Sequence, residues 1–84
     1  MNHKDVACKI RSELKLIGIK CCVFIGILAG SKVINVSTKS YEQEFTDDEK
    51  YMINSVAIGF GLVHADNSEI IPTDIFGKQA VFYL

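Results

Sequence analysis

The sequence predicts a single α+β domain over residues 1–84, with two helices packed on one face of a small antiparallel sheet. Three observations predict it. The chain has 84 residues, enough for only one core. Apolar residues recur at helical spacing in two segments, and β-branched and aromatic residues gather in three others. The expected order of elements is α-β-β-α-β.

The first helix is predicted over residues 3–16, followed by two strands. Its apolar positions recur at spacings of four, four and three, on one face: Val6, Ile10, Leu14 and Ile17. Asn2 can cap its start and Gly18 its end. Residues 19–28 and 32–38 are predicted as strands, joined by a turn at residues 29–31 into an antiparallel hairpin.

The segment KCCVFIGILAG, residues 20–30, is apolar on both strand faces. One face carries Cys21, Val23, Ile25 and Ile27, and the other carries Cys22, Phe24, Gly26 and Leu28. We interpret it as the central strand of the sheet, with the first of these faces under the helices. The second face is covered either by the chain's own tail, through Ile70, Ile71, Ile75 and Phe76, or by a second copy or a foreign partner. The candidate partner or dimer residues are Cys22, Phe24 and Leu28.

The second helix is predicted over residues 47–58, because Thr46 and Glu49 have the spacing of a capping box. Gly59 and Gly61 end it. Residues 62–64 are interpreted as a short extended piece, and the apolar end of the chain, residues 79–84, is expected to add a third strand.

Charge is divided unevenly along the chain, although the net charge is −1. Residues 1–39 carry seven bases against two acids, and residues 40–84 carry two bases against eight acids. The strongest cluster is Glu42, Glu44, Asp47, Asp48 and Glu49. It is either a solvated linker with a well-capped helix start, or an acidic patch that imitates a nucleic-acid backbone and binds a basic groove of a protein.

A basic stripe on the first helix is the alternative binding surface. Lys4, Arg11 and Lys15 share one helix face at spacings of seven and four, and Lys20 and Lys32 follow. Such a stripe could bind nucleic acid, but the slightly acidic total charge and the single arginine favour a solvated face, and no exposed aromatic platform is evident.

No catalytic motif is present, and we expect a protein without enzymatic activity, cofactor or metal site. Cys8, Cys21 and Cys22 have no metal-ligand spacing, and we interpret them as small buried hydrophobic residues in a reducing compartment. The apolar runs are too short to span a bilayer and the N-terminus has no signal-peptide core. The expected location is the cytoplasm.

The run VACKIRSELK, then GIKCCVFIG, then INVS and an acidic helix start resembles the small domain associated with large polyvalent phage proteins. In that domain an IR..LK helix precedes a hairpin and a second helix. The similarity covers roughly residues 6–60 and the final AVFYL. It implies a small protein of a phage or mobile element, in the host cytoplasm, with no assigned catalytic residues.

Three functions follow from these observations. The first is a protein-interaction module that binds and inhibits a host protein, such as a defence complex, or pairs with a second copy of itself. The second is a nucleic-acid accessory protein that uses the basic helix face. The third, suggested only by the helix–hairpin–helix order, is a scaffold similar to profilin or roadblock proteins.

Overall fold

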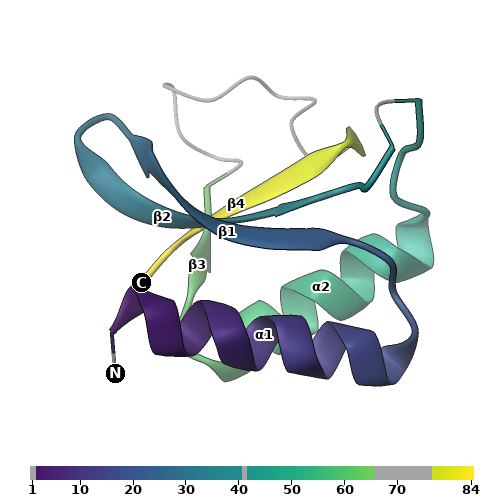
Figure 1. Cartoon of the computed structure of the whole chain (residues 1–84), viewed down its shortest axis with the longest axis horizontal. Helices are drawn as coiled ribbons and strands as arrows, with labels where there is room; N and C mark the ends of the chain where they lie inside the picture. The colour runs from purple at the N-terminus through teal and green to yellow at the C-terminus, as the bar shows by residue number, and fades with distance from the viewer. Residues whose placement is uncertain (1, 41, 66–76) are drawn as a thin grey trace.

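A computed structural model of the chain describes residues 2–40, 42–65 and 77–84. Two helices cover one face of a four-stranded antiparallel sheet (Figure 1). The elements are α1 (His3–Ile17), β1 (Cys22–Leu28), β2 (Ser31–Ser37), α2 (Asp47–Gly59), β3 (Val63–His64) and β4 (Gln79–Tyr83). The predicted α+β class and the α-β-β-α-β order are confirmed. The expected extended piece after α2 is β3, which has only two residues.

The strand order in the sheet is β1-β2-β4-β3. The interpretation of the first strand as central is therefore wrong, because β1 lies at the edge. β4 takes the inner position on the other side of β2, where Phe82 pairs with Ile34 and Ala80 pairs with Val36. The middle of β4 is buried on both faces, which is typical of an inner strand.

The core lies between the helices and the sheet. Its side chains come from both helices, from the inner strands and from the connecting segments. The largest of the fully enclosed ones are Val6, Ile10, Leu14, Ile34, Val36, Ile53 and Phe82. The predicted apolar face of the first helix is thus confirmed for three of its four residues. Ile17, the last residue of α1, is 43% exposed instead.

Both helices begin at the predicted caps and α1 ends at the predicted Gly18, whereas α2 continues through Gly59, has Phe60 as its C-cap and is followed by Gly61 with a φ of 81°. The Asn2 side chain accepts a hydrogen bond from the Asp5 backbone N–H at 2.9 Å, and Gly18 follows α1 with a φ of 93°. At α2 the capping box is complete: Thr46 Oγ1 accepts from the Glu49 N–H at 3.1 Å, and the Glu49 carboxylate accepts from the Thr46 N–H at 2.9 Å.

The turn of the β1–β2 hairpin determines which backbone groups of β1 are free. Ala29 and Gly30 both have positive φ, 52° and 80°, as a two-residue type I′ turn requires. In such a hairpin the flanking pair, Leu28 and Ser31, exchanges hydrogen bonds, and every second pair does the same. The backbone groups of Cys22, Phe24, Gly26 and Leu28 therefore face β2. Those of Val23, Ile25 and Ile27 point to the open edge of the sheet.

Candidate protein-interaction edge

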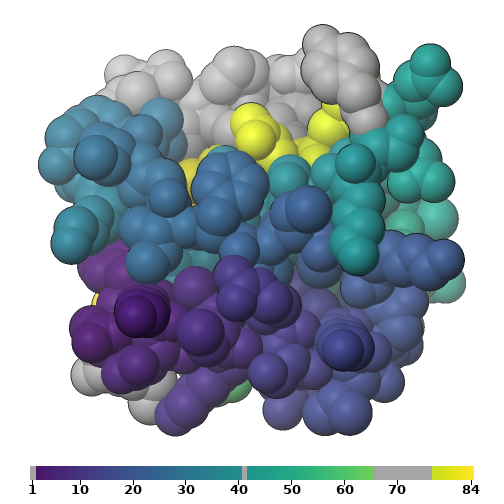
Figure 2. Space-filling view, viewed as in Figure 1, coloured from purple at the N-terminus to yellow at the C-terminus, as the bar shows by residue number. Residues whose placement is uncertain are grey.

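One edge of β1 is open in the described part of the structure. Among the described residues, β2 is the only strand paired with β1. Figure 2 shows β1 as a blue band across the middle of one face, directly above the purple α1. Proteins usually protect an edge strand with charges, prolines or bulges. β1 has the sequence CVFIGIL over seven residues, without a charge or a proline, and pairs with β2 in unbroken register. This edge can accept another strand.

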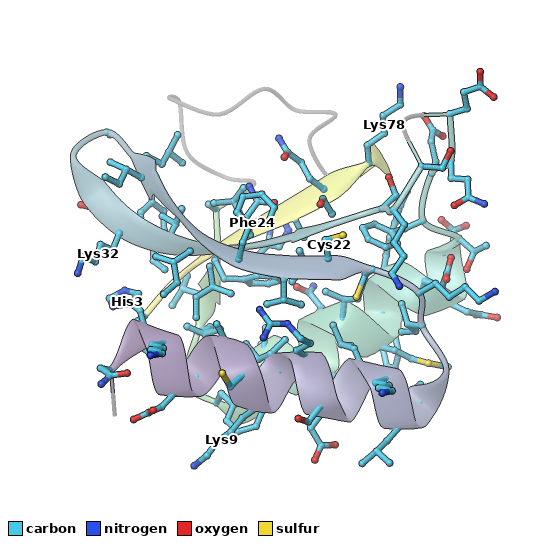
Figure 3. All side chains as sticks on the ribbon, in the orientation of Figure 1. His3, Lys9, Cys22, Phe24, Lys32 and Lys78 are labelled. Atoms are coloured by element: carbon cyan, nitrogen blue, oxygen red, sulfur yellow. The ribbon has the colours of Figure 1, made fainter. Side chains whose placement is uncertain are left out.

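Exposed apolar side chains lie on both sides of that edge. Ile27 is 75% exposed and Ile25 is 41% exposed, and both lie on the helix side of the sheet with the buried Val23. Phe24 is 46% exposed and points away from the helices (Figure 3). The helix side of β1 was predicted to be covered along its whole length. Ile25 and Ile27 remain accessible because an edge strand has a neighbour on one side only.

Arg11 forms a side-chain hydrogen bond to this edge. Its Nη2 donates to the Val23 carbonyl oxygen at 2.6 Å. The bond agrees with the outward direction of the Val23 backbone groups, and it occupies one acceptor of the open edge. Sequence reasoning missed this role, because the contact joins a helix to a strand and the spacing of residues within either segment does not indicate it.

The basic stripe of α1 runs along the same edge. Lys4, Arg11 and Lys15 all lie within α1 and are exposed, and the Arg11 bond places their side of the helix next to β1. Asp5 and Glu13 point to other sides of α1, given 100° per residue. Lys32 lies on the β1–β2 hairpin (Figure 3) and pairs in register with Ile27, while Lys20 is exposed just before β1.

The three residues predicted as an apolar contact, Cys22, Phe24 and Leu28, lie on one face of β1, the face away from the helices. Leu28 packs against a second small cluster on the sheet face away from the helices, which consists of Val33, Ala65 and Val81 with Tyr83. Cys22 and Phe24 are exposed. The residues expected to cover this face from the tail, Ile70, Ile71, Ile75 and Phe76, lie outside the described residues.

Some residues of the acidic segment stabilise the start of α2. Glu49 belongs to the capping box, and the Asp47 carboxylate lies 3.8 Å from the Lys50 ammonium in an exposed ion pair. Glu42, Glu44 and Asp48 are exposed. Three carboxylates in the first turn of α2 also stabilise the positive end of the helix dipole. The capped helix start is thus present, and the acidic patch stays a prediction.

The cysteines differ from the expectation of buried hydrophobic residues. Cys8 and Cys22 are exposed, and only Cys21 is half-buried, beside the core. Cys8 lies on the outer side of α1, and Cys22 is on the sheet face opposite to that of Val23. Burial raises the pKa of the Cys21 thiol, and the neighbouring Cys22 adds to this. Cys21 therefore holds its proton more firmly than an ordinary thiol.

We expect Cys21 to react most slowly of the three thiols with an aromatic disulfide reagent at neutral pH. Partial burial shields its sulfur, and the raised pKa reduces its thiolate fraction. Its labelling rate should rise with pH through a midpoint above that of an unhindered thiol. Mass spectrometry of the labelled peptides measures this. Cys21→Ser should remove the slow phase, and a slow phase that persists in this variant contradicts the assignment.

Other surfaces of the described residues have fewer features of a binding site. An open hollow of about 370 Å³ lies over α1 and the end of α2, lined by Cys8, Lys9, Ser12, Glu13 and Phe60. In the described part of the chain, no group of three His, Cys, Asp or Glu side chains could hold a metal ion. No helix among these residues has the length and apolar character needed to cross a membrane.

Comparison with known proteins found no match: no family model, no curated protein and no solved structure matches the chain.

Proposed function

We propose that the chain is a non-enzymatic protein-interaction module that binds its partner by strand addition at the edge of β1. The observation that carries the proposal is the open edge itself. The backbone groups of Ile25 and Ile27 point outward from a strand that has no charge, proline or bulge. An extended segment placed there gains main-chain hydrogen bonds, which provide affinity, and contacts with alternate side chains, which provide specificity.

Exposed apolar groups on both sides of the strand support the same proposal. A partner strand would lie about 4.8 Å from β1. One set of its side chains would pack beside Phe24 and the other beside Ile25 and Ile27, which now expose between 41% and 75% of their surfaces. Removing this surface from water favours binding. The binding free energy would come from contacts along β1 and not from a deep pocket.

The biological setting is part of the proposal and follows from the phage-domain resemblance. We propose that the protein acts in the cytoplasm of a host cell, where it occupies a surface of a host protein, such as a defence complex, and inhibits it. The acidic segment, residues 42–49, is the alternative contact surface. Charge reversal in Asp47→Lys/Asp48→Lys would weaken binding only if that segment makes the contact.

Two substitutions at Ile27 test strand addition directly. Ile27→Pro removes the outward N–H and replaces the side chain by the pyrrolidine ring, whereas Ile27→Ala removes more of the side chain and keeps the N–H. Because this N–H does not face β2, the proline variant should keep the fold. With each variant as bait in host lysate, we expect a protein captured by the wild type to be retained by Ile27→Ala and lost by Ile27→Pro.

Thermal unfolding followed by circular dichroism checks that both variants fold. Equal retention of the captured protein by both variants would contradict strand addition. Equal loss would point to apolar contact without main-chain pairing. Retention by both together with loss in Asp47→Lys/Asp48→Lys would assign the contact to the acidic segment.

Nucleic-acid binding is the second candidate, because Lys4, Arg11 and Lys15 form an exposed stripe. Phosphate contacts would give a steep loss of affinity with salt. Nucleic-acid binding requires the stripe and not the edge of β1. Lys4→Glu/Lys15→Glu should therefore abolish it, and Ile27→Pro should not.

A further inference from the structure

We propose that the strand added to β1 is an extended acidic segment of another protein, with carboxylates at every second residue. This inference rests on the proposed function and names the chemistry of the partner. It follows from two observations that meet at one place, the open edge of β1 and the basic stripe of α1 beside it.

The helix side of the edge is positively charged. Arg11 reaches the Val23 carbonyl, so an added strand would lie along the side of α1 that carries Lys4, Arg11 and Lys15. Neither lysine has an ion pair with a described residue. Carboxylates on a partner strand would place negative charges close to these two ammonium groups.

The other side of the edge requires a different kind of side chain. Successive residues of a strand point to opposite faces. Residues of the partner that face away from α1 would lie beside the half-exposed Phe24, where apolar side chains fit. The complementary sequence therefore alternates acidic and apolar residues, and glutamate suits the acidic positions because its methylene groups can pack beside Ile25 and Ile27.

Arg11 has a particular place in this arrangement. Its guanidinium occupies the Val23 carbonyl, which a partner strand would otherwise use. A carboxylate facing α1 offers the guanidinium a charge-assisted and often bidentate partner. Transfer of Arg11 to that carboxylate frees the carbonyl for the strand. A strand without acidic residues would offer the exposed Arg11 guanidinium only water or a neutral acceptor in place of the Val23 carbonyl, so the same residue favours acidic partners over neutral ones.

A second copy of the chain fits this edge poorly. Antiparallel pairing of two β1 strands relates the copies by a two-fold axis perpendicular to the sheet, which keeps both α1 helices on the same face. Lys4, Arg11 and Lys15 of each copy would then face those of the other. Like charges at such a junction oppose association, and we expect the free protein to be a monomer.

Two synthetic peptides test the inference: an eight-residue peptide of alternating glutamate and valine, and its counterpart of alternating lysine and valine. By fluorescence anisotropy at low salt, we expect the glutamate peptide to bind the wild type about tenfold more tightly, as two or three exposed ion pairs would give. Lys4→Glu/Lys15→Glu should reverse this preference. Lys9→Glu/Lys50→Glu changes the net charge equally away from the edge and should leave the preference unchanged.

The outcomes separate this inference from the proposed function. Equal or weaker binding of the glutamate peptide, or no binding of either peptide, overturns the acidic partner. If the wild type is a dimer and Ile27→Pro dissociates it, strand pairing at the edge is supported. The edge then belongs to a second copy, and the acidic partner is overturned. Undiminished binding of the glutamate peptide by Ile27→Pro overturns strand addition itself. Binding of a DNA or RNA oligonucleotide that Lys4→Glu/Lys15→Glu abolishes and Ile27→Pro does not would overturn both in favour of nucleic acid.

Discussion

Replacing Phe82 by alanine is expected to lower the free energy of unfolding by about 3–5 kcal/mol. Phe82 is fully buried in β4, between Ile34 of β2 and His64 of β3. Its ring meets the His64 ring edge to face, with 5.0 Å between the centroids. At roughly 0.05–0.15 kcal/mol per residue, a domain of 84 residues has about 4–13 kcal/mol in total. The substitution would remove a large part of it.

Urea unfolding measures this loss, and Phe24→Ala is its matched control. The same atoms are removed from β1, but Phe24 is already 46% exposed, so we expect a loss of about half as much or less. Equal losses at the two positions would contradict the assignment of the core to the helix side of the sheet.

The helices could be predicted closely because their signals are local. Asn2 and Asp5, or Thr46 and Glu49, are three residues apart, so each pair forms its hydrogen bond within one helical turn. The spacing of the apolar residues of α1 gives its buried face in the same way. The exception, Ile17, lies at the last residue of the helix, next to Gly18.

The order of the strands could not be predicted from the same kind of signal. β1 and the segment that becomes β4 are both apolar on both faces, and about fifty residues separate them. Both pair with β2, one on each side. Of the two, β4 alone gains a further neighbour among the described strands, β3, and this pairing decides which apolar strand is inside the sheet and which is at its edge.

The candidate site could be predicted only in part, because it depends on the strand order. Phe24 and Cys22 were predicted as contact residues and are exposed, because they lie on the face away from the helices in either strand order. Ile25 and Ile27 were assigned to the covered face, and they become accessible only when β1 is the edge strand. The contact between Arg11 and Val23 joins a helix to that edge, and the spacing of residues within either segment does not indicate it.

Amide hydrogen exchange along β1 should alternate from residue to residue in the free protein. The N–H groups of Phe24, Gly26 and Leu28 face β2, whereas those of Ile25 and Ile27 face the open edge. An amide that opens only by unfolding of the hairpin, at a cost of about 4 kcal/mol, exchanges on the order of a thousandfold more slowly than an open one. Adjacent residues of one strand should thus differ by up to that factor.

Residue-resolved exchange followed by NMR also provides the comparison with the bound state. The inward amides serve as the internal control, because a partner on the open edge leaves their hydrogen bonds to β2 in place. A general stabilisation of the fold by a ligand bound elsewhere would instead slow the exchange of α1, α2 and β4 together.

The most direct test is therefore the exchange of the Ile25 and Ile27 amides in the free protein and in its complex with the alternating glutamate–valine peptide. Strand addition predicts fast exchange at both amides in the free protein and strong protection in the complex, with Phe24 and Gly26 protected in both. A saturated complex in which the Ile25 and Ile27 amides still exchange as fast as in the free protein would contradict binding at the edge of β1.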